Sequence, residues 1–124
     1  MEVKIGPYPD YGSDRPISIE IAPYDIWNMH HTLALIIHPM LELLCKSGHG
    51  APPISNEDVP EGLHKPEGMA PSEIDTAYFA RWEYVLNEMR WSFDQLRVRD
   101  LPEETTRIDN GLRLFGKYYR DLWT

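Results

Sequence analysis

The sequence predicts a mainly α-helical α+β domain, in which a short N-terminal β-hairpin is followed by three main helices. Three observations support this class: isoleucines that alternate with polar residues near the N-terminus, long segments with an apolar residue every three or four positions, and proline and glycine clusters between these segments. The 124 residues have the size of a single domain. With 42% hydrophobic and 11% aromatic residues, the chain can build a buried core.

Residues 1–22 are expected to form the hairpin. Residues 3–6 and 17–21 have strand patterns, and in the second of these every other residue is isoleucine, which is the period of a half-buried strand. The intervening segment GPYPDYGSDRP is dense in turn-forming residues. We therefore expect two antiparallel strands with a long connection, stabilised by a helix packed on them.

The first helix is predicted over residues 25–46. Asp25 is a suitable N-cap, the Ser47-Gly48 pair is a typical C-terminal signal, and Pro39 should kink the helix. Its expected core face consists of Ile26, Met29, Leu33, Ile36, Ile37, Met40 and Leu44. Residues 47–71 are rich in proline and glycine and lack periodicity, so we expect a long loop that is either functional or mobile.

Two further helices are predicted over residues 73–97 and 102–123, and their short connection favours an antiparallel helical hairpin. Helical spacing gives the first of them one broad apolar stripe, formed by Tyr78, Phe79, Trp82, Val85, Leu86, Met89, Phe93 and Leu96. The last helix has Ile108, Leu112, Phe115, Tyr119 and Leu122 on one face. Tyr84 and Trp91 fall on the side opposite the broad stripe, where we expect a second copy to bind and form a homo-oligomer.

Charge and hydropathy exclude several classes of function. The formal net charge of −8 argues against general binding to nucleic acids, and no apolar segment is long enough to span a membrane. The N-terminal segment lacks the basic and apolar regions of a signal peptide, and the single cysteine fits a reducing compartment. Residues 1–75 carry 4 basic and 12 acidic side chains, whereas residues 76–124 carry 8 of each. A site for an anion is therefore expected in the C-terminal half.

A candidate ligand site lies on the last helix. Arg107, Asn110, Arg113 and Lys117 are spaced along its polar side, and arginine presents planar donors suited to phosphate oxygens. Tyr84 and Trp91 would add a wall on which a ring can stack. The alternative is an ordinary solvated helix face, because an amphipathic helix needs one.

No residue pattern indicates catalysis, a metal site or a cofactor. Cys45 ends an apolar helical run, which favours a buried, inert thiol. His38 and Glu42 have the i,i+4 spacing of two metal ligands, but no third ligand accompanies them in a known motif. Glu83 and Glu88 would be the candidate magnesium ligands of a nucleotide hydrolase, although they do not share a helix face.

The chain resembles a small, uncharacterised protein family of tailed bacteriophages. The resemblance rests on YDIWNMHHTLALIIHPMLELL (24–44), HGAPPISNEDVPEGL (49–63), FARWEYVLNEMRWSF (79–93) and RIDNGLRLFGKYYRDLW (107–123). It implies a phage or prophage origin and action in the cytoplasm of an infected bacterial host. It implies no activity and no catalytic residues.

Three hypotheses of function follow. The first is a phage accessory protein that binds a small phosphorylated ligand such as a cyclic nucleotide, and so withholds an immune signal of the host. The second is a module that binds a host or phage protein through the face that carries Tyr84 and Trp91. The third is a metal-dependent nucleotide hydrolase. The absence of a reactive constellation favours the first two over an enzyme.

Overall fold

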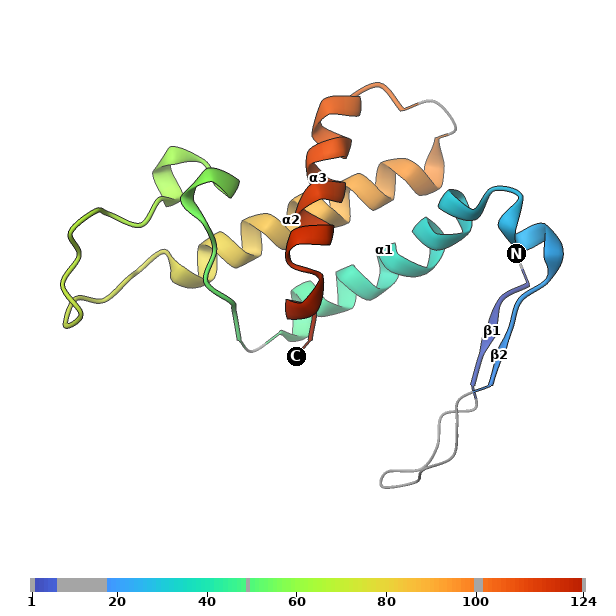
Figure 1. The fold of residues 1–124 in the computed structure, drawn as a ribbon, viewed down its shortest axis with the longest axis horizontal. Coiled ribbons are helices and arrows are strands. Elements are labelled where there is room, and N and C mark those ends of the chain that lie inside the picture. The colour runs from blue at the N-terminus through green and yellow to red at the C-terminus, as the bar shows by residue number, and fades with distance from the viewer. Residues whose placement is uncertain (1, 7–17, 49, 100–101, 124) are drawn as a thin grey trace.

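The computed structural model describes residues 2–6, 18–48, 50–99 and 102–123. These residues form the helices α1 (Met29–Ser47), α2 (Tyr78–Val98) and α3 (Thr105–Lys117), and the strands β1 (Lys4–Ile5) and β2 (Ile19–Glu20) (Figure 1). Short 3-10 helices are η1 (Pro23–Ile26), η2 (Asn56–Asp58), η3 (Glu61–Leu63) and η4 (Tyr119–Asp121). The predicted class, mainly helical with a short N-terminal hairpin, is confirmed.

The hairpin extends away from the three helices (Figure 1). Its strands pair antiparallel with Lys4 opposite Glu20 and Ile5 opposite Ile19. The predicted connection, residues 7–17, lies outside the described residues. Ile19 is exposed, as is Ile21 just after the strand, which corrects the expectation of a half-buried strand stabilised by a helix packed on it. The alternating pattern identified the strand, but no helix covers the apolar side of its described part.

Asp25 joins the hairpin to the helices instead of capping α1. Its buried carboxylate accepts hydrogen bonds from the backbone N–H groups of Glu2, at 2.7 Å, and Ala22, at 2.9 Å. The residue belongs to η1, and the N-cap of α1 is Asn28. The predicted start of the helix at residue 25 is therefore corrected, because the Asp25 side chain is used by the preceding turn.

Helix α1 is a single helix that includes Pro39, and it buries a different face from the one predicted. Ala34, His38 and Leu41 are its buried residues, while Met29 and Met40 of the predicted core face are exposed. Helix α2 packs against the side of α1 that carries these buried residues, and His38 Nε2 lies 3.5 Å from Asp94 Oδ1 of α2. Part of the apolar stripe of α1 is consequently left uncovered.

Helix α2 is the centre of the fold, since α1 and α3 both pack against it. The predicted stripe is confirmed at its five central positions, where Trp82, Val85, Leu86, Met89 and Phe93 are buried. Phe79 is exposed at the start of the helix, so the stripe is covered only beyond its first turn. This helix begins at residue 78 instead of 73, because residues 71–77 form turns.

Helix α3 crosses α2 obliquely in Figure 1 instead of running alongside it as an antiparallel hairpin. A Cβ atom added at Gly111 would collide with the Ser92 side chain and lie 3.0 Å from the backbone oxygen of Glu88, so the two helices approach closely there. The described helix starts at Thr105, after Pro102, and ends at Lys117, before η4. Its buried residues Ile108, Gly111 and Leu114 define a core face that is rotated from the predicted one.

The segment between α1 and α2 is tied to the helices by hydrogen bonds. The Tyr78 hydroxyl donates to the backbone oxygen of Ala51 at 2.7 Å, and Arg81 Nη1 donates to that of Leu63 at 3.0 Å. Ile54 and Val59 are buried in the core cluster. The aperiodic, proline-rich segment thus supplies part of the core, although its sequence gives no periodic signal of this.

Candidate functional site

The side of α2 that carries Tyr84 and Trp91 is covered by Arg107 of α3. The guanidinium of Arg107 lies over the ring of Trp91, with Cζ 3.8 Å from the ring centroid. It also donates to both carboxylate oxygens of Glu88, with Nη2 2.7 Å from Oε2 and Nε 3.2 Å from Oε1. Hydrogen bonds from Arg107 to Glu88 raise the pKa of the guanidinium, so it stays charged. The cation predicted to hold an anion is therefore bound to the α2 face.

Tyr84 belongs to the same cluster. Its hydroxyl donates to Glu88 Oε1 at 3.4 Å, and its ring packs against the buried core. Burial raises the pKa of the Tyr84 hydroxyl, and the negative charge of Glu88 raises it further. Tyr84 and Trp91 are both partly buried, and a ring that stacked on Trp91 from this side would have to displace the Arg107 guanidinium.

A second cluster lies at the other end of α3, around Asp58 of η2. The Asp58 carboxylate is buried, and its Oδ2 accepts hydrogen bonds from Lys117 Nζ and from the Tyr118 hydroxyl, both at 2.6 Å. Arg113 Nη2 lies 2.8 Å from Asp58 Oδ1. Burial by itself would raise the pKa of Asp58, but the hydrogen bonds from Lys117, Tyr118 and Arg113 together hold that pKa below its ordinary value.

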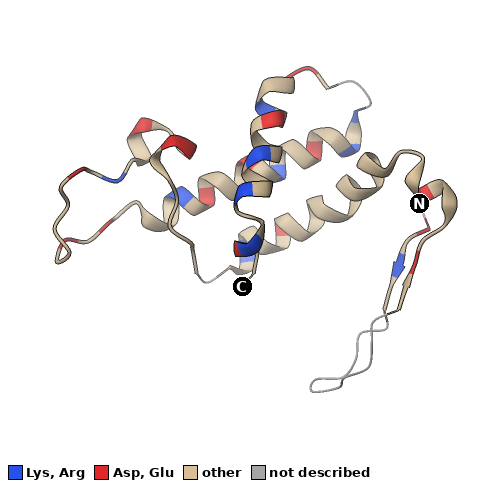
Figure 2. Ribbon diagram, in the orientation of Figure 1, with Lys and Arg blue, Asp and Glu red and all other residues tan. Residues whose placement is uncertain are grey.

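The remaining predicted anion contact, Asn110, binds Arg113. Its side-chain oxygen accepts hydrogen bonds from Arg113 Nε at 3.0 Å and Nη2 at 2.8 Å. Lys117 additionally reaches Glu57 Oε1 at 3.0 Å, and hydrogen bonds to Asp58 and Glu57 raise the pKa of its ammonium group. Figure 2 shows these basic residues spaced along α3. To bind Arg107, Arg113 and Lys117, a phosphate would have to displace the protein carboxylates that these side chains already contact.

Asp58 was missed by the sequence analysis. It lies in the aperiodic segment, and nothing in its immediate sequence distinguishes it from the other acidic residues there. Only the fold brings it to α3, 59 and 60 positions from Lys117 and Tyr118. We interpret the cluster as the contact that holds residues 55–58 to the end of α3, because Ser55, Glu57 and Asp58 all bind Lys117 or Tyr118.

The described residues contain no group of three or more His, Cys, Asp or Glu side chains that could hold a metal ion. His38 Nε2 lies 3.4 Å from Glu42 Oε1 and 3.5 Å from Asp94 Oδ1, and Asp94 is bound by Arg97 at 2.6 Å. Asp94 is thus already paired with a cation of its own chain, the Arg97 guanidinium.

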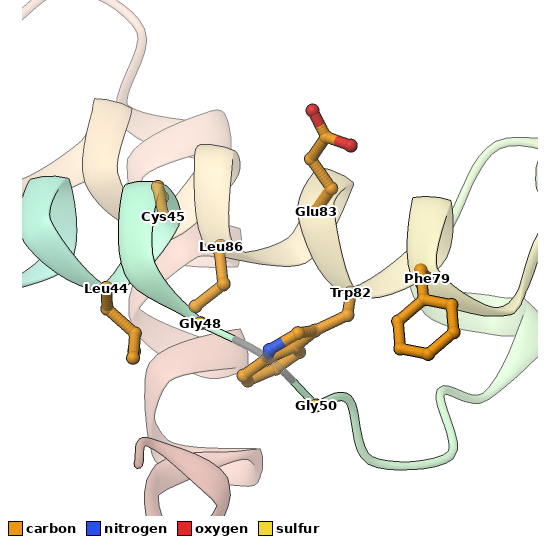
Figure 3. A pocket seen from close by; sticks show the side chains of 8 residues that line it. All are labelled: Leu44, Cys45, Gly48, Gly50, Phe79, Trp82, Glu83 and Leu86. Carbon is orange, nitrogen blue, oxygen red and sulfur yellow. The ribbon is translucent and has the colours of Figure 1, made fainter. Parts of the chain in front are cut away.

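Glu83 and Glu88 lie at different sites, so they do not form the carboxylate pair of a magnesium-dependent hydrolase. Glu88 binds Arg107, whereas Glu83 lines a cavity of about 270 Å³ beside Cys45 and Trp82 (Figure 3). Cys45 is exposed, which corrects the expectation of a buried thiol. Partial desolvation raises the pKa of the thiol, and Arg90 offsets this only in part, so Cys45 is not activated as a nucleophile.

An apolar groove of about 630 Å³ lies between α1 and the segment that follows α3. It is lined by Leu33, Ile37, Met40, Leu41, Leu44, Phe115, Tyr119, Leu122 and Trp123, without a charged side chain. We call this the α1–α3 groove. The residues include most of those predicted as core faces of the first and third helices. The two apolar faces meet here, but they leave a space open between them.

Comparisons with protein-family models, with curated proteins and with solved structures find no match to this chain. In the part of the chain that the structure describes, no helix is both long and apolar enough to cross a membrane. The functional argument therefore depends on the geometry of the clusters and of the α1–α3 groove.

Proposed function

We propose that this protein is a non-enzymatic interaction module that binds an α-helix of another protein in the α1–α3 groove. The observation that carries the proposal is the groove itself, a space of about 630 Å³ lined by aliphatic and aromatic side chains. Tyr119 and Trp123 at its edge are largely exposed, and aromatic residues of this kind are enriched at protein interfaces. By contrast, the charged side chains of the Arg107 and Asp58 clusters are paired with other side chains of the same chain.

The shape of the groove favours a helix as the ligand. Its α1 wall extends from Leu33 to Leu44, which corresponds to about 16 Å along a helix axis. A partner helix of three turns would match this length and place apolar residues at i, i+3, i+4 and i+7 against it. The net charge of −8 favours a partner whose flanking residues are basic, because opposite charge accelerates association.

The test uses a displayed library of amphipathic helical peptides selected on the immobilised protein. We expect enriched peptides with helical apolar spacing, and at least a tenfold weaker affinity for the Leu122→Glu variant, because a carboxylate would be placed in the groove. The matched control is Ile74→Glu, which makes the same change at a residue that is 83% exposed and lies outside the groove. Enriched peptides that bind Leu122→Glu as tightly as the wild type would overturn the proposal.

The hypothesis of a small phosphorylated ligand predicts a different result. Calorimetric titration with cyclic nucleotides and other nucleotides should then release heat, and Arg113→Ala should abolish it. The pairing of Arg113 with Asp58 and Asn110 argues for no measurable heat. Nucleotide binding that depends on Arg113, without peptide binding, would favour sequestration of a nucleotide signal over the interaction module.

The resemblance to the tailed-phage family supports a proposal about where this protein acts. We propose that the module acts in the cytoplasm of an infected bacterium, on a host or phage protein. We also propose that it does so as a homo-oligomer, which the sequence predicts from the helix face that carries Tyr84 and Trp91.

A further inference from the structure

A smaller cavity of about 270 Å³ adjoins the α1–α3 groove at Trp123, which lines both spaces. Its other lining residues are Gly50, Ala51, Pro52, Pro53 and Asp121. We call it the Asp121 cavity, because Asp121 is the only charged residue among these six described residues. The groove lining is entirely uncharged, whereas the cavity beside it includes an acidic residue.

The Asp121 carboxylate has no basic partner within the part of the chain that the structure describes. Lys117 stands four residues earlier, a spacing at which opposite charges on a helix can meet, but it binds Asp58 and Glu57 instead. The backbone oxygen of Asp121 accepts a hydrogen bond from the Trp123 N–H at 3.0 Å, which fixes the two residues relative to each other. Asp121 is partly buried and Trp123 is 73% exposed, so a ligand can reach both from solvent.

The Arg107 cluster shows what a carboxylate and an indole ring bind elsewhere in this protein. There, the guanidinium lies over the ring of Trp91 and donates to both carboxylate oxygens of Glu88. Asp121 and Trp123 supply the same two kinds of group, two residues apart in the chain. Arginine suits such a pair because its planar guanidinium can stack on an aromatic ring and donate two hydrogen bonds to a carboxylate.

We propose that the Asp121 cavity binds an arginine side chain of the partner helix that occupies the α1–α3 groove. The guanidinium donates to the Asp121 carboxylate and lies against the Trp123 ring. The net charge of −8 favours a cation here over an anion or a neutral group. The cavity as a cation site stands on its own geometry, but the assignment of the arginine to the helix in the groove rests on the proposed function.

The position of the cavity places the arginine at one end of the partner helix. The α1 wall of the groove ends at Leu44, and Gly50 follows the end of α1 by three residues. Figure 1 shows the C-terminal end of the chain near the last turn of α1, and Trp123 and Leu44 line the same groove. An arginine within about one helical turn of the last apolar contact can therefore reach Asp121.

An NMR titration of the isotope-labelled protein with acetyl-arginine methylamide tests the cavity itself. We expect shifts of the Trp123 indole N–H and of the Asp121 and Gly50 amides at concentrations on the order of 10 mM, the weak range expected of one side chain. The citrulline analogue, which has nearly the same shape without the charge, should give no such shifts.

The matched variants in this titration are Asp121→Asn and Asp109→Asn, which remove the same charge at two sites. Asp109 is an exposed residue of α3 that lines neither the groove nor the Asp121 cavity. The shifts should disappear in Asp121→Asn and persist in Asp109→Asn. Equal shifts in Asp121→Asn, or equal shifts with the citrulline analogue, would overturn the inference.

A double-mutant cycle with a peptide selected on the groove tests the assignment to the partner helix. Enriched peptides should carry an arginine at one end of their apolar stripe. Asp121→Asn should weaken binding of such a peptide roughly fivefold, and citrulline in place of the peptide arginine should do the same. The two changes together should weaken binding no further than either alone, because each removes the same contact. Losses that multiply would contradict the pairing.

The two proposals can fail separately. Peptides that lack a basic end residue and bind Asp121→Asn as tightly as the wild type would retain the interaction module and overturn the arginine site. Shifts with acetyl-arginine methylamide that depend on Asp121, together with no selected peptide, would retain the cavity as a cation site. They would overturn the module and the assignment of the arginine to its helix.

Discussion

The side of α2 that carries Tyr84 and Trp91 and the side of α1 that carries Met40 and Leu43 both present large apolar side chains, but only the first is covered. On α2, the ring of Trp91 lies under the Arg107 guanidinium, and Glu88 binds the same group. On α1, Met40 and Leu43 are exposed. The difference arises because α3 crosses α2 and has few direct contacts with α1. An apolar face thus becomes core or interface according to the position of the third helix.

Two methionines provide the largest expected contrast between the helices. Met89 of α2 is fully buried, whereas Met40 of α1 is 64% exposed. We expect Met89→Ala to lower the free energy of unfolding by about 2–5 kcal/mol, since it opens a cavity in the core. Met40→Ala should change it by less than about 0.5 kcal/mol, because this side chain is largely exposed. Equal losses in urea titrations would mean that Met40 belongs to the core.

Two glycines of α3 test how closely that helix approaches α2. Gly111→Ala should lower the free energy of unfolding by about 1–3 kcal/mol, because the new Cβ would collide with Ser92. Gly116→Ala meets nothing within 4 Å and should raise the free energy of unfolding by up to about 1 kcal/mol through higher helix propensity. Opposite shifts of the thermal midpoint would confirm the crossing point. A stabilising Gly111→Ala would contradict it.

Asp58 tests how α3 is held in place, with a somewhat smaller effect. Asp58→Asn should lower the free energy of unfolding by about 1.5 kcal/mol at neutral pH, since it removes the charge that binds Lys117 and Arg113. The folded-state pKa of Asp58 is below the ordinary value, so its contribution is present above the unfolded pKa of about 3.9. It is lost as the pH falls through the folded-state pKa.

The measurement is the difference in stability between wild type and Asp58→Asn, followed by urea unfolding from pH 7 to pH 2. We expect a constant difference down to about pH 4 and a decrease below it. Glu57→Gln is the control, because Glu57 also binds Lys117 but its side chain is largely exposed. A difference that grows on acidification would show that Asp58 is not the group that titrates.

The candidate site shows how far sequence reasoning reached. It placed Arg107, Asn110, Arg113 and Lys117 on one helix, and the structure brings Arg113 and Lys117 to one carboxylate. That carboxylate, Asp58, comes from an aperiodic segment, so no spacing rule relates it to α3. Sequence periodicity can place residues on a helix face, but it does not identify a partner that depends on how a distant loop is folded.

Local interactions determined the three helices and the two strands, and the sequence was sufficient to predict that these elements exist, although not where each helix begins and ends. Helical spacing defined the buried stripe of α2 from Trp82 to Phe93, and alternation defined the hairpin strands. These signals are local, because hydrogen bonds within a helix and turn preferences involve residues near one another in the chain. The same spacing also placed the apolar residues of α1 and α3 on helices.

Only the tertiary structure decided which apolar residues are buried. The predicted core faces of the first and third helices contribute Leu33, Met40, Phe115 and Tyr119 to an open groove. Both helices pack against α2 instead: His38 of α1 lies 3.5 Å from Asp94, and Gly111 of α3 allows close approach to Ser92. Periodicity is a property of one helix, whereas burial depends on which neighbour approaches it and from which side.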